Sequence, residues 1–242
     1  MDARRLVAGV LSGAALVAAP VLVVTVQAAP AAAASASAST LYKDALATTR
    51  SWSVHYASAS TDSKETLKES GNAGPASASQ TVLLGKGSIS ILVIGDISYL
   101  KGNVNGLEDL AGLSSSQAAE AAGQWIEFST DNAAFAPVVE GVRSTDLAKE
   151  LALKDPLSLG HASRLNGEAV DAIDGTQAIG KKSEHVVLYV RADGTHIPVE
   201  EDSVNTKGQH TDAEHIVYSR WGEHVRPEAP KATISIGSIN AV

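Results

Sequence analysis

The chain has 242 residues, a formal net charge of −8 and no cysteine. Lys and Arg are not clustered, so nucleic acid is not an expected partner, and the lack of cysteine excludes disulfides and thiol catalysis. With only 3 Trp, 5 Tyr and 2 Phe, any core must be filled by Val, Leu, Ile and Ala.

The first 28 residues contain the segments of a secretory signal peptide in their usual order. Arg4 and Arg5 precede an apolar run over residues 6–26, and a small-x-small site ends at Ala28. This anatomy predicts export and cleavage after Ala28. Cleavage after Ala34 or Ala36 and an uncleaved membrane anchor are the alternatives.

Residues 29–40 are rich in Ala, Ser and Pro. Such low complexity predicts a disordered linker, followed by a single domain over residues 41–242. The exported part is long enough to bury a substantial core without disulfides.

The first elements of the domain are one helix and a run of short strands. Thr40 can cap a helix over residues 41–50. Alternation of apolar and polar residues, with Trp52, Val54 and Tyr56 on one face, then begins the first strand. Punctuation by turn residues predicts an antiparallel meander, with strands over residues 52–57, 65–72, 79–84, 89–94 and 97–101.

The strand over 89–94 is apolar on both faces. Ile89, Ile91 and Val93 point to one side, while Leu92 and Ile94 point to the other, since side chains alternate along a strand. We expect both faces to be covered, either by helices or by a hydrophobic ligand.

The middle of the chain predicts short helices and an irregular segment over 107–112. Ser114 and Gln117 form a capping box for a helix over 115–122. One or two turns containing Val138 and a helix over 144–154 follow.

Four further strands are predicted over 169–173, 185–192, 195–199 and 211–219. Asp193-Gly194 between two of them is a strong hairpin signal. Strands with helices segregated to one side predict the α+β class.

Several short motifs, taken in order, resemble the LppX/LprG type of actinobacterial envelope lipoproteins, within the LolA-like lipid-carrier superfamily. The motifs together extend over about residues 41–230. They are residues 99–103, 123–125, 165–170, the hairpin around Asp193-Gly194, residues 218–223 and Pro230.

The resemblance implies a strongly curved antiparallel sheet, a half-barrel, whose concave face is covered by short helices and receives acyl chains. The expected function is non-catalytic binding or carriage of a lipid or other hydrophobic ligand in the cell envelope. This chain lacks the lipidated cysteine of those relatives, so membrane contact is expected to be transient or through an uncleaved signal segment. Predicted ligand-wall residues are Ile91, Val93, Leu113, Val138, Leu147 and Leu151.

Other functions are less well supported by the residues. A protein-interaction or envelope-sensing module with an envelope protein partner is the main alternative, and a silent structural domain is another. No cofactor is predicted. Gly-x-Ser-x-Gly is absent, and the chain is expected not to be an enzyme.

The seven histidines raise the question of a metal. In a strand, His210, Asp212 and Glu214 would share one face, while His215 points to the other. No His-x-x-x-His pair on a helix is present, so no metal site is predicted.

Overall fold

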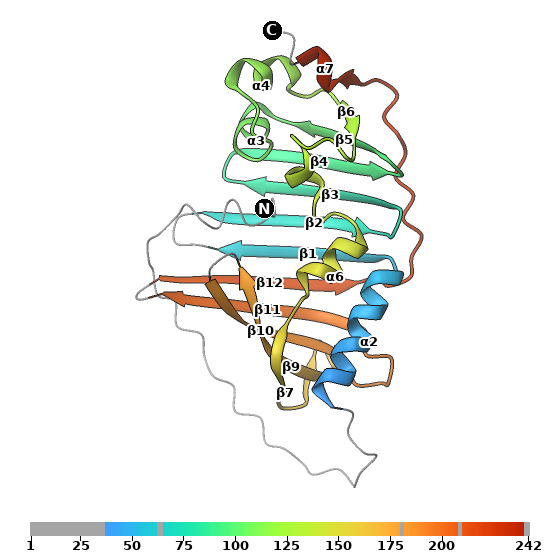
Figure 1. Cartoon of the computed structure of the whole chain (residues 1–242), viewed down its shortest axis with the longest axis vertical. Helices are drawn as coiled ribbons and strands as arrows, with labels where there is room; N and C mark the ends of the chain where they lie inside the picture. The colour runs from blue at the N-terminus through green and yellow to red at the C-terminus, as the bar shows by residue number, and fades with distance from the viewer. Residues whose placement is uncertain (1–36, 62–64, 180–181, 208–209, 240–242) are drawn as a thin grey trace.

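A computed structural model describes residues 37–61, 65–179, 182–207 and 210–239. The predicted signal peptide and residues 29–36 of the predicted linker lie outside these ranges, while residues 38–40 of that linker are helical. The described strands form one large curved sheet (Figure 1). Its first half consists of β1 (Val54–Thr61), β2 (Thr66–Ala73), β3 (Ser77–Leu84), β4 (Gly87–Ile94), β5 (Ile97–Gly102) and β6 (Ile126–Ser129).

The second half of the sheet comes from the C-terminal part of the chain. It consists of β7 (Lys154–Leu159), β8 (Ser163–Leu165), β9 (Glu168–Ile179), β10 (Lys182–Arg191), β11 (Pro198–Lys207) and β12 (His210–Ser219). A last short strand, β13 (Ile234–Ser235), pairs parallel with β6, and the other described pairs are antiparallel.

The sheet order is β13-β6-β5-β4-β3-β2-β1-β12-β11-β10-β9-β7, with β8 beside β9. Strands β1 and β12 therefore meet in the middle, with His55 opposite Ser219. The sheet is open, with separate edges at β13 and β7, and this confirms the predicted half-barrel α+β fold.

The helices lie on one face of the sheet (Figure 1), as predicted. They are α2 (Ala38–Ser51), α3 (Val104–Asp109), α4 (Ser115–Ala121), α5 (Ala136–Val139), α6 (Ser144–Glu150) and α7 (Ile236–Ile239). We call the face that they cover the inner face.

The predicted meander is confirmed, and glycines at its turns explain its regularity. Two residues, Gly85 and Lys86, join β3 to β4, and Gly95 and Asp96 join β4 to β5. Both glycines have positive φ, 54° and 57°. Two-residue hairpins of this kind need positive φ, which glycine adopts without steric cost.

The structure corrects several helix predictions. Helix α2 begins three residues before the predicted start, and Ser37 rather than Thr40 caps it. Trp52 follows α2 and is 46% exposed, so it does not extend the buried row of Val54 and Tyr56. Residues 107–109, predicted to be irregular, are the end of α3.

The end of α6 is also corrected. The helix stops at Glu150 rather than residue 154, because β7 begins at Lys154 and pairs with β9. The predicted capping box of α4 is confirmed, since Ser114 and Gln117 each accept a hydrogen bond from the other's backbone N–H.

The C-terminal strands are longer than predicted. The Asp193-Gly194 turn joins β10 to β11, but β11 begins only at Pro198. Thr195 instead belongs to the turn, because its backbone N–H donates to Asp193 Oδ1 over 2.9 Å. Residues 220–233, which we call the C-terminal strap, then run past the ends of the central strands to β13 (Figure 1).

Candidate functional site

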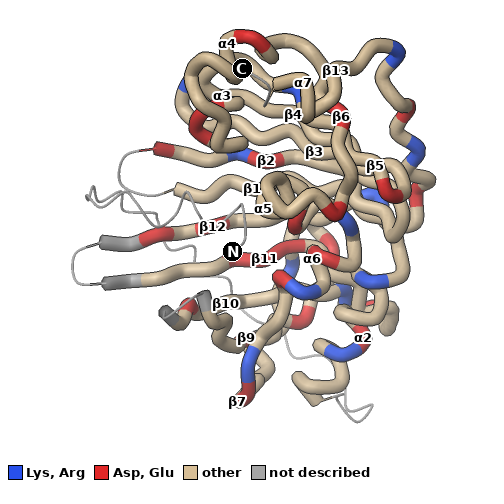
Figure 2. The backbone as a smooth tube through the Cα atoms, turned by 45° about the horizontal axis from the view of Figure 1, so that its top comes forward, with Lys and Arg blue, Asp and Glu red and all other residues tan. Residues whose placement is uncertain are grey.

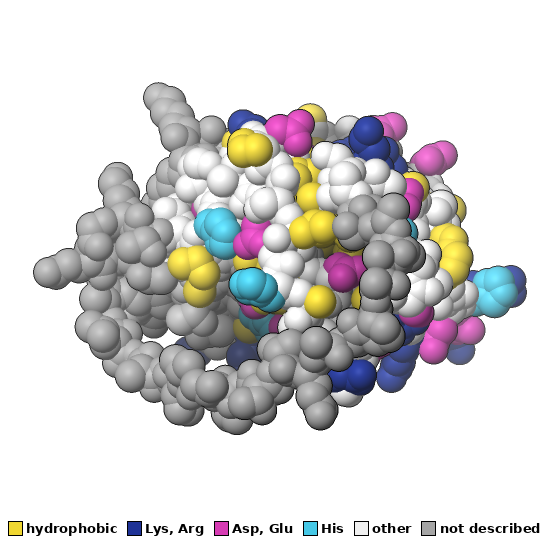
Figure 3. All heavy atoms as spheres, turned by 90° about the horizontal axis from the view of Figure 1, so that it is seen from below, with side chains coloured by type: hydrophobic (Ala, Val, Ile, Leu, Met, Phe, Trp, Pro, Cys, Tyr) yellow, Lys and Arg dark blue, Asp and Glu magenta, His cyan; other side chains and the backbone are white. Residues whose placement is uncertain are grey.

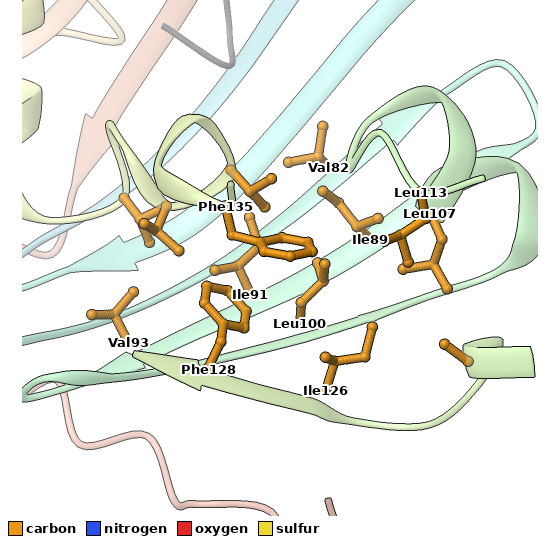
Figure 4. Packing of buried hydrophobic residues seen from close by; sticks show 14 of the residues in the cluster. Val82, Ile89, Ile91, Val93, Leu100, Leu107, Leu113, Ile126, Phe128 and Phe135 are labelled. Atoms are coloured by element: carbon orange, nitrogen blue, oxygen red, sulfur yellow. The ribbon is translucent and has the colours of Figure 1, made fainter. Parts of the chain in front are cut away.

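Two hydrophobic clusters occupy the inner face. Cluster one lies on β3 to β6 beneath α3, α4 and α5, and Figure 4 shows its side chains converging between sheet and helices. Its β4 residues Ile89, Ile91 and Val93 are at most 3% exposed. Phe128 and Phe135 pack with ring centroids 4.9 Å apart and are the only aromatic residues in this buried set.

Cluster two lies on β1, β9, β10 and β12 beneath α2 and α6. Leu41 and Ala45 of α2 and Leu147 of α6 pack against Ile173 and Leu188 of the sheet. The Tyr42 hydroxyl donates to the Leu151 backbone oxygen over 2.8 Å. This bond ties α2 to the segment that follows α6.

Buried polar side chains separate the two clusters on the inner face. Ser58 of β1 donates to Glu69 of β2 over 3.3 Å, and both side chains are at most 7% exposed. A further buried polar pair lies within cluster two, where the Tyr218 hydroxyl of β12 donates to Glu201 of β11 over 3.1 Å. These buried carboxylates are hydrogen-bonded, as burial requires.

The helices over cluster one have little stability of their own. Helices α3, α4 and α5 have 6, 7 and 4 residues, well below the length at which an isolated helix is stable in water. Helix α5 also lacks a side-chain N-cap bond, and α4 buries only Ala118 and Ala121. Packing against the sheet therefore holds these helices in place.

The six predicted wall residues are all buried, and they divide between the clusters. Cluster one contains Ile91, Val93, Leu113 and Val138. Cluster two contains Leu147 and Leu151, each 1% exposed. The structure therefore does not bring the six residues together in one wall.

The other face of β4 is less covered than the sequence predicts. Leu92 and Ile94 point away from the helices and are half-buried, whereas their neighbours Ile91 and Val93 are buried. The outer face of this strand is shielded only in part by adjacent side chains. The expectation of full cover on both faces is wrong.

A group of possible metal ligands lies on β11 and β12, at residues that the sequence analysis did not combine. Glu200, Asp202 and His215 place their ligand atoms within 4.8 Å of one another. His215 Nδ1 lies 2.7 Å from Asp202 and 3.7 Å from Glu200. Burial raises the pKa of Glu200, and the nearby His215 acts in the opposite direction by lowering it. A hydrogen bond between His215 and Asp202 accounts for this arrangement without a cation.

Among the surface pockets lined by described residues are two that include no predicted wall residue. One, of about 290 Å³, lies between α6 and β9, and most of its lining residues are charged. The other, of about 250 Å³, lies beneath the C-terminal strap. At the β7 end of the molecule, Figure 3 shows scattered hydrophobic side chains among charged groups and histidines in the described part of the surface.

The fold is similar to that of known structures. LprF from Mycobacterium bovis matches 80% of this chain and 96% of its own, with 13% identity and a TM-score of 0.51. The lipoprotein LppX of Mycobacterium tuberculosis matches 78% of this chain and 97% of its own, with 17% identity and a TM-score of 0.48. The likeness to LprF confirms the type of fold that the resemblance implied.

A more distant likeness is to the MucA/MucB complex of Pseudomonas aeruginosa, with 16% identity and a TM-score of 0.42 over 85% of this chain and 61% of that one. No protein-family model matches the chain, and no curated protein matches it. Within the described residues, no helix is long and apolar enough to cross a membrane.

Proposed function

We propose that this protein binds or carries a lipid or other hydrophobic ligand outside the cytoplasmic membrane, without catalysis. The ligand would occupy the inner face of β3 to β6, where cluster one now lies. The LprF-like fold and the aliphatic composition of this face support the proposal.

The observation that carries the proposal is the weak cover of an aliphatic sheet face. The buried side chains of α3, α4 and α5 meet this face through apolar contacts, so a guest that offers equivalent contacts can replace them. Each methylene removed from water contributes about 0.8 kcal/mol. An acyl chain of a dozen carbons could therefore offset the loss of helix packing.

Within this proposal, Ile91 and Val93 form the floor of the site, and Leu113 and Val138 belong to the segments that move. Leu147 and Leu151 would contact only a ligand that extends into cluster two. The buried polar row at Ser58 and Glu69 would limit how far an apolar chain extends across the sheet.

Native mass spectrometry of protein exported by its own host, followed by organic extraction, tests for a bound lipid. A co-purifying lipid supports carriage. Protein that is empty and also ignores fluorescent fatty acids contradicts the proposal and favours the alternative of a protein-interaction module.

A matched pair of α4 variants locates the site. Ala118 faces the sheet and is fully buried, whereas its neighbour Ala119 is exposed. Ala118→Leu puts a larger side chain where the ligand would lie and should weaken fatty-acid binding by roughly tenfold, equivalent to about 1.4 kcal/mol. Ala119→Leu should leave binding unchanged. Equal binding by both variants would place the ligand elsewhere.

A further inference from the structure

The pocket beneath the C-terminal strap gathers positive charge in an acidic protein. Its charged lining residues are Arg220, Arg226 and Glu223, and two histidines, His55 and His224, also line it. The whole chain has a net charge of −8. Figure 2 shows basic and acidic positions alternating along the strap, at the right of the view.

The two arginines lack ion-pair partners within the described residues. No carboxylate there lies within salt-bridge distance of Arg220 or Arg226. Glu223 is the single carboxylate residue in the lining, so arginine exceeds it two to one. The pocket thus offers two guanidinium groups that pair with no carboxylate among the described residues.

The outer face of the sheet supplies a fixed row of polar groups to the same pocket. His55, Asn72 and Ser79 are direct neighbours on β1, β2 and β3. The Asn72 amide nitrogen donates to Ser79 Oγ over 3.4 Å, so its oxygen is left to accept from His55 Nδ1 at 3.1 Å. This leaves the Ser79 hydroxyl hydrogen available to a ligand, whereas the Nε2 of neutral His55 is an acceptor.

Backbone contacts hold the strap in position over this row. The Gly222 N–H donates to the Ser53 backbone oxygen over 2.8 Å, and the Ser53 hydroxyl donates to the Glu223 backbone oxygen. Trp221 Nε1 donates to the Pro198 oxygen over 2.9 Å. Arg220 itself has a φ of 52°, which non-glycine residues rarely adopt. The surrounding contacts therefore fix the backbone from which Arg220 projects.

We propose that the strap pocket binds a phosphate group. The guanidinium groups of Arg220 and Arg226 and the Ser79 hydroxyl provide more donors than the two oxygens of a carboxylate need, and they suit the several oxygens of a phosphate. The group belongs either to a free phosphate or to a lipid headgroup. This site is separate from the apolar face of cluster one.

Titration calorimetry of the full chain with sodium phosphate at constant ionic strength tests the proposal. The double variant Arg220→Asn/Arg226→Gln removes both guanidinium groups, and asparagine tolerates the positive φ at its position. Saturable phosphate binding should weaken at least roughly tenfold in this variant. Lys231→Gln removes an equal type of charge from the same strap outside the pocket, and should leave binding unchanged.

The outcomes are separable. No saturable binding at millimolar phosphate, equal loss in Lys231→Gln, or equally tight binding of acetate would overturn the proposal. Melting temperatures check the fold, and Arg226→Gln alone serves if the double variant unfolds. Fatty-acid binding should survive the double substitution, so failure of this proposal does not bear on lipid carriage.

Flotation with vesicles distinguishes the two sources of phosphate. If the wild type binds vesicles that contain phosphatidylglycerol but not pure phosphatidylcholine, and the double variant loses this binding, the ligand is a lipid headgroup. If vesicles are ignored while inorganic phosphate binds, the ligand is a free phosphate. Both results support a phosphate site.

Discussion

Clusters one and two lie on the same sheet, but they are built differently. Cluster two lies under α6, which has seven residues, and under α2, a helix of 14 residues with an N-cap bond that a tyrosine hydroxyl joins to the chain after α6. Cluster one lies under helices of 4 to 7 residues. Under the proposed function, cluster two anchors the fold, while a ligand displaces the cover of cluster one.

Equal deletions in the two clusters should give the largest difference. Leu188 of cluster two and Leu100 of cluster one are both 0% exposed. Leu188→Ala should lower the free energy of unfolding by about 4 kcal/mol, and Leu100→Ala by about 2–3 kcal/mol, because short helices can settle into the space left behind. Urea unfolding measures both values. A larger loss in Leu100→Ala would contradict the proposed contrast.

Removal of the hydrogen bond between Tyr218 and Glu201 tests how the part of the sheet under cluster two is held together. Tyr218→Phe removes the donor from a carboxylate that is 6% exposed, and should cost about 2 kcal/mol at neutral pH. Tyr99→Phe removes a hydroxyl from a residue that is also 6% exposed, and no described partner lies within hydrogen-bond distance of that hydroxyl. Thermal unfolding should show a clear loss for the first variant and little for the second.

Removal of a helix cap should act differently in the two halves. Ser37→Ala in α2 and Ser114→Ala in α4 should each cost about 1 kcal/mol of helix stability. Loss of the cap should let α4 open locally from cluster one. Backbone hydrogen exchange in α4 should then accelerate more than in α2. Similar acceleration of exchange in both helices would mean that α4 does not open independently of the rest of the fold.

The smallest expected effect is on the pH dependence of stability, through Glu200 on β11. Burial raises the pKa of Glu200 above its usual value. A raised folded-state pKa favours the protonated form, so stability is lost as pH rises through that pKa. Glu200→Gln should therefore raise the melting temperature slightly at pH 7, and the gain should vanish at a pH below the usual range of Glu. A gain that persists at low pH would show another cause.

The meander was predictable because its signals are local. Each two-residue turn contains a glycine, and alternation fixes which side chains face the core, so β4 and β5 agree with the prediction to within two residues. Strand β7 was missed because Leu147 and Leu151 extend a helical spacing toward it, and because Pro156 is typical of a helix stop. Its pairing with β9 depends on distant residues.

The candidate sites were less predictable because they depend on register. Glu200 and His215 meet only because β11 and β12 pair with Asp202 opposite His215. The strap pocket combines residues near position 55 with residues near position 225, and no local pattern connects them. Burial of the six wall residues followed from hydrophobicity, but their division between two clusters required the strand order.

The pairing of β1 with β12 has a consequence for how the chain assembles. Neighbours in the first half of the sheet are neighbours in sequence, so β1 to β5 can join as soon as they are made. The edge of β1 that faces away from β2 stays unpaired until β12 is made, more than a hundred residues later. Until β12 is made, that edge can pair with other chains. The unpaired edge of β1 is therefore where a nascent molecule is most exposed to aggregation.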